Sequence, residues 1–90
     1  MREIIAHPGP LELTLLLPRE ERRARFEIAA TRDGWCLASE TGSIDDGTSR
    51  RLLHRERGPL ARELLRVVRG MTAAGYVVER LQLRRPTPAA

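Results

Sequence analysis

The chain has 90 residues, of which 41% are hydrophobic and 31% charged, and its formal net charge at pH 7 is +4. This length is enough for one domain with one core, and the single cysteine, Cys36, excludes an intramolecular disulfide. No apolar run reaches the length of a membrane span, and residues 1–17 lack the basic start and cleavage site of a secretory signal. The sequence therefore predicts a reduced, cytoplasmic protein without a membrane segment.

Positive charge is concentrated in one part of the sequence. All 16 basic residues are arginine, and residues 50–69 contain seven of them against two glutamates. The remainder holds nine arginines against ten acidic residues, so the window carries the whole positive excess. Such asymmetry favours an anionic partner, and the alternative explanation is a solvated face of a helix.

The first predicted elements are a lead-in and a strand. Residues 1–10 end in His-Pro-Gly-Pro, which suits neither a helix interior nor a central strand, so we expect a flexible lead-in. Leucines then occupy every second position over residues 11–17, which predicts a half-buried strand that ends at Pro18. Residues 19–23 form a charged connector.

Alternation resumes over residues 24–30, with Phe26, Ile28 and Ala30 on the inward face. An Asp-Gly pair follows, which favours a tight hairpin into a third strand over residues 35–40. Beyond a glycine-containing loop, residues 48–55 are compatible with a fourth strand.

A helix is predicted in the C-terminal half. Gly58-Pro59 marks its start, because proline suits the first helical position. The apolar residues that follow recur with helical spacing and form one stripe. They are Leu60, Leu64, Val67, Val68 and Met71. Gly75 is placed to end the helix, which we therefore expect over residues 59–74.

A last strand is predicted over residues 76–83, and residues 84–90 are expected to be a disordered tail. Strands outnumber helices, and hairpins produce antiparallel sheets. The sequence thus predicts an α+β domain over residues 11–83, in which an antiparallel sheet of four to five strands is packed on one face by a single main helix.

Candidate catalytic and metal-binding residues do not gather in the sequence. His7 and His54 each stand alone, and neither lies within a short ligand spacing of Cys36. Asp45-Asp46 lacks the alternating oxygen ligands and the distal glutamate of a calcium loop. No serine or cysteine stands in a pattern typical of an activated nucleophile. We therefore expect no enzyme activity, no metal site and no cofactor.

The arginines of the basic window are candidates for contacting an anion. Those of the helix recur at i, i+4 and i+7, and the others directly precede it. They are Arg50, Arg51, Arg55, Arg57, Arg62, Arg66 and Arg69. If the two groups form one surface, they are suited to binding a phosphate backbone without reading its sequence. Only three aromatic residues are present, too few for a platform on which bases stack.

One stretch resembles a known family. The residues that carry the resemblance are Trp35, Leu37, Glu40, Thr41, Gly42, Ser43, Ile44 and Gly47. In this order they are similar to the signature of the WGR domain, a strand reading W-x-L followed by W-G-R-I-G and a further glycine. The predicted elements agree in order over about residues 11–80. The resemblance implies a small stand-alone bacterial WGR-like protein, and the family is associated with DNA binding and domain contacts.

The departures fall on the residues that name the family. Thr41 stands where the signature tryptophan would be, Ser43 where the arginine would be, and Asp45 replaces the glycine that follows. Gly42, Ile44 and Gly47 remain, so the turn geometry implied by the resemblance is kept while its stacking and charge are lost.

Two functions follow from these observations. In the first, a WGR-like module contacts the backbone of DNA or RNA through the arginines of residues 50–69. In the second, the fold serves as a protein-interaction or assembly module that has lost DNA binding, and its basic surface meets an acidic protein partner. The sequence indicates no oligomeric state.

Overall fold

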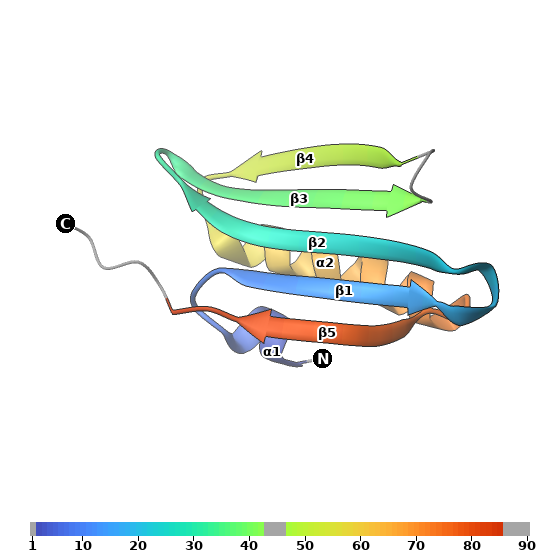
Figure 1. Ribbon diagram of the computed structural model, residues 1–90. Coiled ribbons are helices and arrows are strands. Elements are labelled where there is room, and N and C mark those ends of the chain that lie inside the picture. Colours follow the sequence, from blue (N-terminus) through green and yellow to red (C-terminus); the bar gives the residue numbers. More distant parts are fainter. Residues whose placement is uncertain (1, 43–46, 86–90) are drawn as a thin grey trace.

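The computed structural model describes residues 2–42 and 47–85 of the chain. They form two layers, a five-stranded antiparallel sheet and a helical layer on one of its faces (Figure 1). In chain order the elements are α1 (Arg2–Ala6), β1 (Leu11–Leu17), the 3-10 turn η1 (Pro18–Glu20), β2 (Arg22–Thr31), β3 (Gly34–Gly42), β4 (Thr48–His54), α2 (Arg57–Ala73) and β5 (Val77–Leu83). The sheet order is β4-β3-β2-β1-β5. The predicted α+β class is confirmed.

The strands pair in the register that the apolar alternation requires. Leu11 lies opposite Ile28 and Leu13 opposite Phe26, so these side chains share the face that α2 covers. All four are buried. The inward direction predicted for β2 is therefore confirmed at Phe26 and Ile28, whereas Ala30 is exposed because it stands near the end of the strand. Residues Arg32 and Asp33 form the turn between β2 and β3.

Helix α2 closes the core with the apolar stripe that its spacing predicts. Leu60, Leu64 and Val68 are buried against the sheet, and Ala61 completes the stripe. The helix begins at Arg57, two residues before the expected start, and ends at Ala73. Gly75 follows with a φ of 108°, which fits its predicted role in ending the helix because few other residues adopt that conformation.

The N-terminal segment differs from the expected flexible lead-in. Residues 2–6 form α1, and Ile4 is fully buried in the core beside α2. The guanidinium of Arg57 fixes this segment: its Nε donates to the carbonyl oxygen of Gly9 at 2.7 Å, and Nη1 donates to that of Ile4 at 2.9 Å. The Nη2 of Arg57 is buried and has no hydrogen-bond partner among the described residues.

The start of the predicted tail is also held on the domain. The backbone amide of Arg84 donates to the carbonyl of Pro10 at 2.9 Å. The side-chain Nη2 of Arg84 lies 2.9 Å from Oε1 of Glu12. Residues 86–90, the rest of the expected tail, lie outside the described residues.

Replacing Arg57 by alanine is expected to lower the free energy of unfolding by about 2 kcal/mol, because two buried carbonyls lose charged donors. Burial lowers the pKa of Arg57, since desolvation disfavours its charged form, and this cost keeps the loss below the sum of two charged hydrogen bonds. Urea denaturation measures the change. Arg55→Ala, at an exposed neighbouring position, is the matched control. Equal stability of the two variants would contradict the role given to Arg57.

Candidate functional site

The two edges of the sheet are built differently. At one edge, β5 pairs with β1 through a register shift between Thr14 and Leu15, which breaks the regular pairing of the two strands. At the other edge, β4 pairs with β3 over seven consecutive residue pairs without a shift. All seven residues of β4 are exposed, and no described element lies beyond it (Figure 1). An edge that is long, regular and uncovered is a ready template for a further strand.

The side chains of β4 alternate between the two faces of the sheet. Leu52 lies opposite the buried Leu37 on the helix side and is 48% exposed. Leu53 points to the other face and is 74% exposed. Edge strands of globular domains usually avoid such side chains, so the two adjacent exposed leucines are an unusual feature of β4.

A groove of about 510 Å³ runs between β4 and α2, because the single helix leaves this side of the sheet partly uncovered. Buried side chains of the core contribute to its lining, and hydroxyls and arginines lie among them. Its lining includes Leu37, Thr41, Arg50, Leu52, Glu63 and Val67. The groove is thus largely apolar, and it is also lined by Arg50 and Arg51, neither of which takes part in an ion pair within the described residues.

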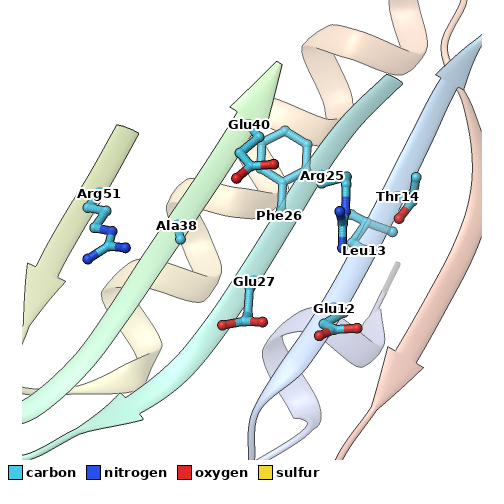
Figure 2. Close-up of a pocket in the computed structure, with 9 residues that line it drawn as sticks. All are labelled: Glu12, Leu13, Thr14, Arg25, Phe26, Glu27, Ala38, Glu40 and Arg51. Atoms are coloured by element: carbon cyan, nitrogen blue, oxygen red, sulfur yellow. The ribbon is translucent and has the colours of Figure 1, made fainter. Parts of the chain in front are cut away.

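The opposite face of the sheet is covered by neither helix and carries mixed charges around a shallow depression of about 250 Å³ (Figure 2). Glu12 and Glu27 lie directly opposite one another on β1 and β2. Arg25 lies opposite Glu40, and Arg51 approaches from β4. No aromatic ring is exposed among these positions, so this face offers no stacking platform for bases.

The seven predicted arginines do not form one surface. Arg50 borders the groove, whereas Arg51 borders both the groove and the depression on the open face of the sheet. Arg57 is buried and bound to backbone carbonyls, which removes it from any surface contact. The remaining four are exposed: Arg55 in the turn before α2, and Arg62, Arg66 and Arg69 on α2. At 3.6 residues per turn these last three fall on the side of α2 opposite Leu64, away from the sheet.

The positions of the WGR-like motif fall at the β3–β4 connection. Thr41 lies opposite Thr48, is half-buried and lines the groove. Gly42 ends β3 with a φ of 124°, a conformation that favours glycine. Gly47 is exposed just before β4. Ser43 and Ile44 lie outside the described residues. No pattern in the sequence predicts the groove beside this connection, because the groove depends on how much of the sheet α2 covers.

Glu63, which borders the groove, forms an ion pair with the exposed Arg66 one turn along α2, with Nε of Arg66 3.0 Å from Oε2 of Glu63. The hydrogen bond from Arg66, assisted by its positive charge, holds the pKa of Glu63 below the ordinary glutamate value. Because the folded-state pKa is depressed, the pair's contribution to stability is present above the unfolded pKa and is lost as pH falls through the folded pKa. We expect an NMR titration of Glu63 to show this lowered pKa, and Arg66→Gln to raise it. An unchanged titration in the variant would contradict the pairing.

None of the described helices is long and apolar enough to cross a membrane. Within residues 2–42 and 47–85, no three His, Cys, Asp or Glu side chains come together as ligands for a metal ion. Comparisons of the chain with protein-family models, with curated proteins and with solved structures find no match. The WGR-like character of the β3–β4 connection therefore stays a prediction.

Proposed function

We propose that the protein is a non-catalytic interaction module that binds an extended segment of a protein partner along β4. The observation that carries this proposal is the structure of the β4 edge. Its seven residues pair with β3 in unbroken register and are all exposed, and each face carries one exposed leucine. A partner strand would satisfy the outward-pointing backbone groups of β4 and cover Leu52 and Leu53 at the same time.

The magnitudes are sufficient for binding. Each main-chain hydrogen bond contributes a net of about 0.5–1.5 kcal/mol, and several form along a seven-residue edge. Covering Leu53 contributes about 1–2 kcal/mol more, because most of its side chain is exposed in the free protein. The irregularity between Thr14 and Leu15 makes the β5 edge a poorer template, so β4 is the preferred edge.

Binding of DNA or RNA backbone is the second candidate. It is favoured by Arg62 and Arg69, which are exposed on α2 and form no ion pair within the described residues. It ranks second because the basic residues are divided between the groove, the open face and the outer side of α2, and because Arg66 is paired with Glu63. A divided set of this kind neutralises fewer neighbouring phosphates.

The test of the first candidate is a selection from a displayed library of random extended peptides, followed by NMR titration of the full chain. Selected peptides are expected to shift the backbone amides of β4, whereas those of β5 serve as the internal control edge. If no selected peptide shifts β4, or if the shifts fall on β5, the proposal is wrong.

The second candidate is tested with double- and single-stranded oligonucleotides at low and at physiological salt. Binding to the phosphate backbone is expected to weaken steeply with salt and to be reduced when Arg62, Arg66 and Arg69 are replaced by alanine. An absence of binding at low salt would exclude this candidate.

A further inference from the structure

The middle of β4 reads Arg50-Arg51-Leu52-Leu53, and the strand geometry distributes these four side chains over both faces. Arg50 and Leu52 lie on the helix side, whereas Arg51 and Leu53 lie on the open side. Each face of the edge therefore presents one guanidinium and one leucine, two residues apart along the strand. A strand paired with β4 meets this pattern on both of its own faces.

Neither guanidinium faces an opposite charge across the β3–β4 pairing. The residues directly opposite them on β3 are Ser39 for Arg50 and Ala38 for Arg51, and neither carries a charge. Within the described residues, Arg50 and Arg51 take part in no ion pair. The nearby carboxylate of Glu63 in the groove is engaged by Arg66. Within the described residues, the charge of both guanidiniums is thus available to a group outside the chain.

A second copy of the chain is a poor occupant of this edge. Residues Thr48–His54 contain no acidic side chain, so no register of two β4 strands sets a carboxylate opposite Arg50 or Arg51. Pairing two copies would bring four guanidiniums close together, and in the register that sets Arg50 opposite Arg51 like charges face one another directly, which is destabilising. The arginines that disfavour self-pairing are also those that select an acidic strand.

We infer, on the basis of the proposed function, that the partner segment carries two consecutive apolar residues followed by two consecutive acidic residues and pairs antiparallel to β4. In this direction its first two residues meet Leu53 and Leu52, and the next two meet Arg51 and Arg50. The antiparallel direction continues the pattern of the whole sheet and is the more stable pairing per residue. On the helix side, the apolar residue opposite Leu52 lies at the mouth of the groove, near Val67.

The order of residues, and not only their composition, carries this recognition. One peptide contains two valines followed by two glutamates between threonines, and its control contains the same residues with valine and glutamate alternating. The alternating peptide places both carboxylates on one face, where only one arginine stands. We expect it to bind the full chain about tenfold more weakly by isothermal titration calorimetry, which corresponds to the loss of about two favourable cross-strand pairs.

Charge exchange provides the decisive variant. Arg50→Glu combined with Arg51→Glu is expected to weaken binding of the valine–glutamate peptide about tenfold or more, and to gain binding of a peptide in which arginines replace the glutamates. Arg62→Glu combined with Arg69→Glu is the matched control, because it makes the same change in net charge on the outer side of α2. Circular dichroism establishes that both double variants are folded.

The outcomes separate the inference from the function on which it rests. Peptides that shift the β4 amides equally well with glutamate or with glutamine would overturn the acidic partner while leaving strand addition intact. A concentration-dependent dimer with protected β4 amides would overturn it in favour of a second copy. If no peptide from the library shifts β4, the proposed function itself is wrong.

Discussion

Gly34→Ala is expected to lower the free energy of unfolding by about 3–5 kcal/mol. A methyl group at this position would lie 2.8 Å from Cα of Arg55 and closer still to the carbonyl oxygen of His54. Both are backbone atoms, so the end of β4 has to move. The φ of 155° at Gly34 adds strain for any other residue. Thermal unfolding should show a midpoint lowered by about 15–25 °C.

Gly70→Ala is the matched control for this substitution. A methyl group at Gly70 meets no atom within 4 Å, and the position is helical. Alanine is expected to raise stability there by about 0.5–1 kcal/mol through its higher helix propensity. Similar effects of the two substitutions would contradict the close approach of β3 and β4 at Gly34. Because the clash is with the end of β4, Gly34→Ala should also weaken peptide binding at that edge.

Leu64→Ala is expected to lower the free energy of unfolding by about 3–4 kcal/mol. Leu64 is fully buried at the centre of the α2 stripe, and its truncation leaves a cavity between the helix and the sheet. Chemical denaturation monitored by the fluorescence of Trp35, which packs against the same core, reports the change. A loss smaller than about 1 kcal/mol would mean that the helix collapses onto the vacated space.

Leu53→Ala is expected to leave stability almost unchanged but to weaken partner binding. Leu53 is 74% exposed, so its truncation should leave stability within about 0.5 kcal/mol of the parent chain. Partner binding along β4 should weaken, because Leu53 supplies the apolar surface of the open face. Full binding by Leu53→Ala would remove this leucine from the proposed interface.

The fold was largely predictable because its signals are local. Strand β1 follows directly from four alternating leucines, and the hairpin into β3 follows from turn residues. Helix α2 follows from an apolar stripe of helical spacing. Each of these patterns is determined by the period of its own element, so tertiary contacts only shift the ends by one or two residues.

Helix α1 was not predictable because it is too short to show a period. Its five residues precede a Pro/Gly-rich segment, which is typical of a flexible loop. The position of α1 depends on the burial of Ile4 in the core and on the hydrogen bonds from Arg57 to the carbonyls of Ile4 and Gly9. A signal for Arg57 was present: it lies three residues before Leu60, on the buried stripe of α2. Because Arg57 is charged, the sequence instead predicts that it is exposed like the other arginines.

The candidate site depends on relations between distant elements. The sequence indicates that residues 48–55 are compatible with a strand, but it does not show that this strand is an edge or that α2 leaves a groove beside it. The sequence also does not show that Arg50 and Arg51 lie on a different surface from the arginines of α2. These relations follow from strand order and helix placement.

The pairing of β5 with β1 has a kinetic consequence. Leu11 and Leu83 are opposite one another in the sheet although almost the whole domain separates them in the sequence, whereas β1 to β4 follow one another through short connections. Closing so long a loop is entropically slow, so we expect β5 to join the sheet last. Until it does, the outer side of the leucine-rich β1 is an open edge. During synthesis this interval is when the chain is most prone to aggregate.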